Sequence, residues 1–163
     1  MRKLIAFAAA AAAVSASAPA FAATDTDTML VTANVVNNCV VTASPMAFGT
    51  LATLGSANID TSATVSLACT PNAAYDVAMD VGLHASGSQR RLVNGGDPTQ
   101  LIPYGLYSDA SRTVAWASGA GATVSGTAAG GVATMVAYGR IPSTAAAVTA
   151  GSYSDTVTVT VTF

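Results

Sequence analysis

Apolar and polar residues alternate with a period of two along much of the chain. In the clearest case, at the C-terminus, Thr156, Thr158, Thr160 and Thr162 alternate with Val157, Val159, Val161 and Phe163. Shorter runs of the same kind occupy residues 65–69 and 75–81. Successive side chains of a β-strand point to opposite faces, so each run predicts a strand with one face toward a core and one toward water.

Turn-forming residues separate these runs. Gly, Pro and Asn cluster at residues 70–72, 94–98, 119–121 and 130–131, which predicts turns or loops there. The alanines at 145–147 are too few to nucleate a helix, and we expect a loop that leads into the final strand. Short strands between closely spaced turns predict an all-β fold, an antiparallel sandwich.

The two ends of this strand pattern are unusual. The most regular predicted strand is also the last, so the sheet edge beyond it is expected to be open. A further alternating run precedes the first cysteine, with an apolar face formed by Met29, Val31, Ala33 and Val35. This run either donates a strand to the open edge of a neighbouring molecule or forms the first strand of its own domain. The pattern alone favours neither interpretation.

The first 22 residues have the pattern of a secretory signal peptide. Arg2 and Lys3 precede an apolar stretch over residues 4–14, and Ala20-Phe21-Ala22 fits the small residues of a signal-peptidase site. The stretch is shorter than the roughly 20 apolar residues that a membrane-spanning helix needs. We therefore predict export, cleavage after Ala22 or one residue later, and no membrane span.

Charge limits the choice of partners. Removing 22 of the 163 residues leaves 141, the size of a single domain. This part carries four arginines, eight aspartates, no lysine and no glutamate, for a net charge of −4. Scattered arginines form no basic patch, which argues against a nucleic-acid or anionic-membrane partner.

The two cysteines, Cys39 and Cys69, predict a disulfide, because an even pair in an exported chain is normally oxidised. Closing the loop between them is expected to stabilise the fold by about 3–4 kcal/mol. A metal site is disfavoured, since the chain has a single histidine and no Cys-x-x-Cys motif.

Candidate catalytic chemistry is sparse. There is no Gly-x-Ser-x-Gly motif, and any acid–base pair would have to consist of aspartates. Simple structural positions account for the remaining candidates: a loop for His84, a solvated strand face for Asp76 and Asp80, a solvated loop for Arg90 and Arg91, and the core for Trp116. We therefore predict a structural protein rather than an enzyme, with no catalytic residue, cofactor or metal ion.

Short motifs occur in order along nearly the whole chain after the signal sequence: Cys39, Phe48-Gly49, residues 65–70, 75–79 and 104–109, Trp116, and residues 138–142 and 150–163. Together they resemble the spore coat protein U domain family, whose members include subunits of archaic (Csu-type) chaperone–usher pili. The resemblance implies an incomplete immunoglobulin-like antiparallel sandwich that is completed by donor-strand exchange.

The resemblance also implies roles for particular residues. Residues 23–38 would be the donor segment and residues 39–163 the pilin-like domain. The inserted side chains would be those of Met29, Val31, Ala33 and Val35. The strand bordering the acceptor groove would carry Val157, Val159, Val161 and Phe163, and Cys39 and Cys69 would form the family's disulfide. Pro103 removes a ladder donor, so we expect it to begin a strand or lie on an edge.

The partners implied by the resemblance are a periplasmic chaperone, an outer-membrane usher, and neighbouring copies of this chain or related subunits. The protein would be exported through the periplasm into an extracellular pilus and would support adhesion or biofilm formation. A shaft subunit is preferred to a tip, because 141 residues leave no space for a receptor domain. The alternative is a self-contained secreted spore-coat or surface protein whose residues 29–36 pair within their own domain.

Overall fold

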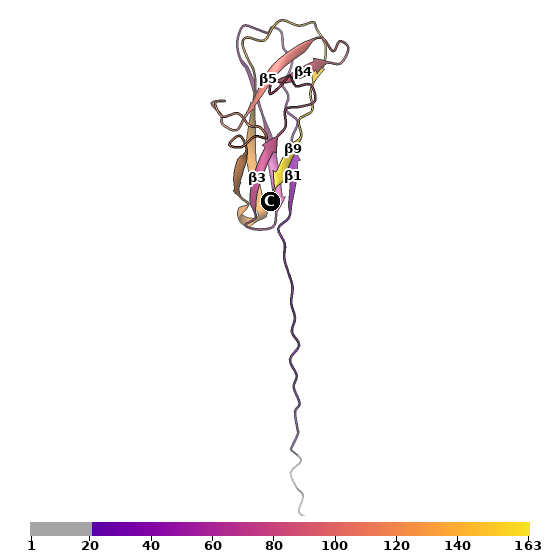
Figure 1. Ribbon diagram of the computed structural model, residues 1–163, viewed down its shortest axis with the longest axis vertical. Helices are drawn as coiled ribbons and strands as arrows, with labels where there is room; N and C mark the ends of the chain where they lie inside the picture. The colour runs from indigo at the N-terminus through magenta and orange to yellow at the C-terminus, as the bar shows by residue number, and fades with distance from the viewer. Residues whose placement is uncertain (1–20) are drawn as a thin grey trace, which may run out of the picture. The chain divides into compact units, whose positions relative to one another are not determined.

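The computed structural model describes residues 21–163, and residues 1–20 of the predicted signal peptide lie outside them. Residues 21–38 belong to no helix or strand, and the compact part of the chain begins at Val35. That part contains a short 3₁₀-helix, Ala129–Gly131, and the following strands (Figure 1): β1 (Cys39–Ala43), β2 (Ile59–Cys69), β3 (Ala74–Met79), β4 (Arg90–Asn94), β5 (Leu101–Tyr107), β6 (Val124–Thr127), β7 (Val132–Ile141), β8 (Tyr153–Ser154) and β9 (Val159–Thr162).

The strands form two sheets. One has the order β1-β2-β7-β5-β4-β8 and the other the order β6-β3-β9. Every ladder between neighbouring strands is antiparallel. The predicted all-β, antiparallel fold is therefore confirmed.

A single core lies between the two sheets. The first sheet contributes Val65 and Leu106 and the second contributes Val77, each almost fully buried. Trp116, from the loop after β5, is completely buried, and its indole Nε1 donates a hydrogen bond to the Val77 carbonyl at 2.8 Å. Burying an indole brings a large apolar surface into the core, and this bond satisfies its one donor. The predicted core position of Trp116 is confirmed.

Pro103 lies within β5, not at its start. β5 lies between β4 and β7 in the sheet, but its pairing with β7 covers only Gly105 to Tyr107, so β4 alone pairs with the strand at Pro103. The amide of Asn94 donates to the carbonyl of Gln100, so these two residues form a hydrogen-bonded pair of the β4–β5 ladder. Bonded and non-bonded pairs alternate along an antiparallel ladder, and Arg91 and Pro103, three positions further on, are therefore a non-bonded pair. The missing N–H of Pro103 therefore removes nothing from the ladder.

The disulfide joins Cys39 and Cys69, as predicted. These residues face each other at the first position of the β1–β2 ladder. The bond therefore fixes the start of an edge strand to the end of β2, the longest strand of the structure. Closing this loop is worth about 3–4 kcal/mol in the chain-entropy model.

The prediction of a solvated loop around Arg90 was wrong. Arg90 begins β4 and is only 5% exposed. Its guanidinium donates to the backbone carbonyls of Met79, Asp80 and Trp116 at 2.5–3.1 Å. A buried charge is tolerated where its donors are satisfied. Burial nevertheless lowers the pKa of this guanidinium.

Candidate functional site: the unpaired edges of β1 and β9

Strand β9 pairs with β3 on one side only. The amide of Asp80, just beyond β3, donates to the carbonyl of Thr158 at 3.0 Å. Because backbone groups alternate along an antiparallel strand, Thr158, Thr160 and Thr162 bond toward β3. The N–H and C=O groups of Val157, Val159 and Val161 therefore point to the other edge, which no strand among residues 21–163 covers.

Strand β1 has a matching free edge. The amide of Ser44 donates to the Thr64 carbonyl and the amide of Thr70 to the Asn38 carbonyl, so even-numbered residues bond toward β2. By the same alternation, Cys39, Val41 and Ala43 turn their backbone groups away from β2. In Figure 1, β9 lies between β3 and β1, and the Cα atoms of β1 and β9 approach within 8 Å of each other. Two unpaired edges thus border one gap.

This gap is narrower than a strand requires. Neighbouring strands in a sheet are about 4.8 Å apart, so a strand between β1 and β9 would place them about 9.6 Å apart. Because Cα atoms of the two strands lie within 8 Å of each other, admitting a strand requires the edges to separate by at least about 1.6 Å where they are nearest. The inserted strand would then join the six-stranded sheet to the three-stranded sheet of the domain.

An apolar cavity of about 340 Å³ lies behind the gap. Its wall combines side chains from both edges and from the core, including Ala43, Met46, Phe48, Val65, Met79, Leu106, Val157 and Val159. Asp155 and Thr156 also line it, but most of the wall is apolar, and such a lining favours apolar side chains over charged ones. The arrangement offers backbone pairing at its edges and apolar space between them, which are the two requirements for binding an alternating strand.

Polar contacts hold the segment that leads into β9. Asp155 Oδ1 accepts hydrogen bonds from the amide of Leu83 at 3.0 Å and from His84 Nδ1 at 3.0 Å. Asp155 Oδ2 accepts from the hydroxyl of Tyr104 at 2.7 Å, and the Asp155 side chain is only 1% exposed. Burial and the bond to this carboxylate raise the pKa of Tyr104, so the phenol keeps its proton. This network fixes where the free edge begins.

Asp80 makes a second attachment to the same segment. Its Oδ1 accepts hydrogen bonds from the amides of Gly82 and Thr158, both at 2.9 Å. Partial burial opposes ionisation of this carboxyl, but the bonds from Thr158 and Gly82 outweigh it and hold its pKa below the ordinary value. The charged form is therefore the one that holds the start of β9.

The sequence did not predict this polar network. His84 was assigned to a loop without a role, whereas its ring contacts a buried carboxylate. The nearest indication in the sequence is Gly82, whose φ is +81°. A side chain there would collide with the Asp155 carboxylate, and a glycine can mark such a close approach.

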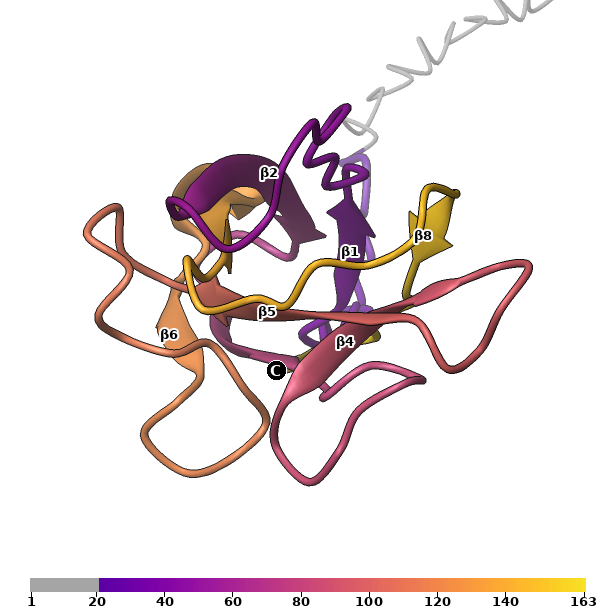
Figure 2. The same cartoon turned by 90° about the horizontal axis from the view of Figure 1, so that it is seen from above.

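A second, larger cavity of about 990 Å³ lies at one end of the domain. Two long loops form most of its wall, residues 46–54 and 147–155. Figure 2 shows the connection between β7 and β8 crossing this end of the sandwich. Met46, Phe48, Leu92 and Asp155 line both cavities, so the two spaces adjoin.

Of the predicted groove residues, Val157 and Val159 line the cavity. Val157, Val159 and Val161 pack partly buried against the core, whereas Phe163 is 51% exposed. The predicted donor residues lie outside any strand: Met29 is 87% exposed, Val31 and Val35 are 81% exposed, and Ala33 is also exposed. Their roles as donor and acceptor remain predictions.

Residues 21–163 contain no group of three or more His, Cys, Asp or Glu side chains that could hold a metal ion. Within the same residues, no helix has the length and apolar character needed to cross a membrane.

The described residues thus form an antiparallel β-sandwich with two unpaired strand edges. A segment without regular secondary structure precedes it. The Spore Coat Protein U domain model matches residues 25–160, and the chain therefore belongs to this family. The predicted family is thus confirmed. No curated protein sequence matches the chain significantly.

A solved structure of a pilus subunit has a similar fold. One similar chain occurs in the CsuC–CsuE chaperone–tip adhesion subunit pre-assembly complex, from archaic chaperone–usher Csu pili of Acinetobacter baumannii. The two chains are 23% identical with a TM-score of 0.57, over 79% of this chain and 40% of that one. This protein therefore spans less than half the length of the chain it matches. A chaperone–tip adhesin complex of CFA/I fimbriae biogenesis also matches, at 12% identity and a TM-score of 0.42, over 68% of this chain and 36% of the other.

Proposed function

We propose that this protein is a structural subunit of a surface pilus that polymerises by donor-strand exchange. The observation that carries the proposal is the pair of unpaired edges, on β1 and β9, that border an apolar cavity. An edge of this kind is a template for a strand from another chain. Residues 29–36 of a neighbouring copy supply such a strand, since they alternate in polarity and belong to no strand of their own.

In this assembly, the apolar face of the donor enters the gap. Met29, Val31, Ala33 and Val35 fill the space beside Val157, Val159, Val161 and Phe163, while the donor backbone bonds to both edges. Burial of four apolar side chains and two new ladders stabilises the polymer. The donor segment comprises residues 23–38, and the domain that receives it residues 39–163.

Membership of the Spore Coat Protein U domain family and likeness to the Csu complex support this proposal. By analogy, a periplasmic chaperone holds the open edges before assembly, and an outer-membrane usher directs the exchange. Export then depends on the signal sequence in residues 1–22, and the finished fibre is extracellular. Adhesion and biofilm formation are the proposed roles of that fibre.

Deleting residues 24–36 tests the proposal directly. The shortened subunit keeps its open edges but lacks a donor, so we expect it to stay bound to the chaperone and to form no polymer. A synthetic peptide of residues 24–36 should bind this subunit and raise its melting temperature. The control peptide carries Val31→Asp and Ala33→Asp, which place charges in the apolar space, and should not bind. Normal fibre formation by the deletion variant would overturn the proposal.

A further inference from the structure

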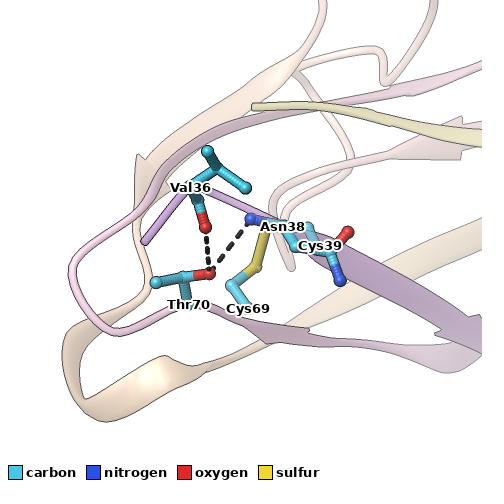
Figure 3. Close-up of a disulfide and its surroundings, with 5 residues drawn as sticks. All are labelled: Val36, Asn38, Cys39, Cys69 and Thr70. Atoms are coloured by element: carbon cyan, nitrogen blue, oxygen red, sulfur yellow. Dashed lines mark hydrogen bonds between the residues drawn. A yellow bond between two sulfur atoms is a disulfide. The ribbon is translucent and has the colours of Figure 1, made fainter. Parts of the chain in front are cut away.

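The hydroxyl of Thr70 holds the place where the N-terminal segment leaves the domain (Figure 3). Thr70 Oγ1 accepts a hydrogen bond from the Asn38 amide at 3.0 Å and donates one to the Val36 carbonyl at 3.2 Å. The Thr70 amide donates to the Asn38 carbonyl at 2.8 Å. Together with the adjacent disulfide between Cys39 and Cys69, these bonds attach residues 36–39 to the end of β2.

Thr70 is itself firmly positioned. Its carbonyl accepts a bond from the Ala73 amide at 3.0 Å, which closes a turn through Pro71 and Asn72. The amide of Asn72 donates to the Ala128 carbonyl at 2.8 Å, and Asn72 has a φ of 63°. The left-handed conformation is unfavourable for a residue other than glycine, so the bond from Asn72 to the buried Ala128 indicates that the surrounding structure fixes this turn. The hydroxyl therefore acts from a rigid support.

We propose that Thr70 is a positioning residue that sets the direction in which the donor segment leaves its subunit, and with it the angle between successive subunits of the fibre. This inference rests on the proposed donor-strand exchange. The Thr70 hydroxyl lies outside the gap between β1 and β9, and it bonds to residues of its own chain.

Little free chain separates the donor residues from the segment that Thr70 holds. The last donor side chain is that of Val35, and the Thr70 contacts begin at the carbonyl of Val36. No residue is left between the neighbour's gap and the clamped segment. Without the hydroxyl, the Thr70 amide still holds the Asn38 carbonyl, but residues 36 and 37 regain soft backbone dihedral angles, two per residue. The connection between the donor segment and β1 then becomes flexible instead of having one fixed backbone conformation.

Hydrogen exchange tests the clamp within the full-length chain. Thr70→Val keeps the shape of the side chain and removes its hydroxyl, so the Asn38 amide should exchange about 3- to 10-fold faster. Thr70→Ser restores the hydroxyl and should return exchange toward the wild-type rate. Thr42→Val is the matched control on β1, because the Thr42 hydroxyl bonds to no residue that the structure describes. An unchanged rate at Asn38 in Thr70→Val would overturn the inference.

Electron cryomicroscopy of fibres tests the consequence. Wild-type, Thr70→Ser and Thr42→Val fibres should show one narrow distribution of the angle between neighbouring subunits, and Thr70→Val fibres a clearly broader one. If all four kinds of fibre show the same distribution of this angle, the inference about Thr70 is wrong, whereas donor-strand exchange is unaffected. If the wild-type chain forms no fibres at all, the proposed function fails and the inference fails with it.

Discussion

The Tyr104 hydroxyl donates a hydrogen bond to Asp155 Oδ2 at 2.7 Å and so connects β5 to the segment that leads into β9. The other oxygen of the same carboxylate holds Leu83 and His84. The start of the free edge is therefore fixed by polar contacts with the rest of the domain. Backbone pairing with β3 holds the chain only from Val159 onward.

Replacing Tyr104 by Phe should destabilise the domain by about 1–3 kcal/mol, because a buried carboxylate oxygen loses its partner. Tyr107→Phe is the matched control: it lies in the same strand, and its hydroxyl bonds to no residue that the structure describes. We expect a change below about 0.5 kcal/mol there. Urea unfolding of both variants provides the measurement. Equal stabilities would mean that the Tyr104–Asp155 bond contributes little.

Replacing Gly82 by Ala should be considerably more damaging than a glycine replacement elsewhere. A Cβ at residue 82 meets the Asp155 carboxylate, and the φ of +81° is strained for an L-residue. Gly121→Ala is the control, since Gly121 has a similar φ of +77° and an added Cβ there would meet no other atom within 4 Å. Strain alone costs about 1–2 kcal/mol, so that is the loss expected at Gly121. Thermal melts should rank Gly82→Ala clearly below Gly121→Ala, and the reverse order would contradict the close approach.

Alternating polarity predicted β3, β9 and the second half of β2, because it reports burial directly. The apolar residues Val65, Leu67, Val77 and Met79 of these runs lie in the core. The same pattern at residues 29–36 corresponds to no strand of the structure. The disulfide could be predicted because the chain contains only two cysteines. These features depend on local pattern or on counting, and neither requires knowledge of how distant segments meet.

The polar network could not be predicted in this way. Arg90 follows glycine and serine residues that suggest a solvated loop, and only the packed structure brings it under the carbonyls of Met79 and Trp116. Asp155 and His84 are 71 residues apart, and no local pattern relates them. The gap between β1 and β9 likewise depends on which strands fail to pair, which is a property of the whole topology.

Acid should weaken the attachment of β9. Asp80 has a lowered pKa in the folded protein, so its contribution is fully present above the ordinary pKa of 3.8 and is lost as the pH falls through the lower folded value. Asp80→Asn cannot ionise and should lose less stability between about pH 5 and pH 2 than the wild type. Unfolding free energies measured across this range check the slope. Parallel curves for the two proteins would show that another carboxylate dominates.

Reduction of the disulfide should separate the start of β1 from β2. In Cys39→Ser with Cys69→Ser, the loop is no longer closed covalently, and we expect a loss of about 2–5 kcal/mol. The measurement is guanidinium unfolding of the double variant beside the oxidised wild type. Reduced wild type serves as the control for the serine hydroxyls and should match the double variant. A loss below about 1 kcal/mol would mean that the ladder alone holds β1.

The last prediction uses the two faces of the donor segment. Val31→Asp places a charge on the face proposed to enter the gap, whereas Thr32→Asp places the same charge on the opposite face, one residue away. A buried, unpaired carboxylate costs about 3–5 kcal/mol, so Val31→Asp fibres should dissociate at much lower denaturant concentration than wild-type fibres. Thr32→Asp fibres should resemble the wild type. Equal weakening by both substitutions would show that the faces are not distinguished, and stronger weakening by Thr32→Asp would place the other face in the gap.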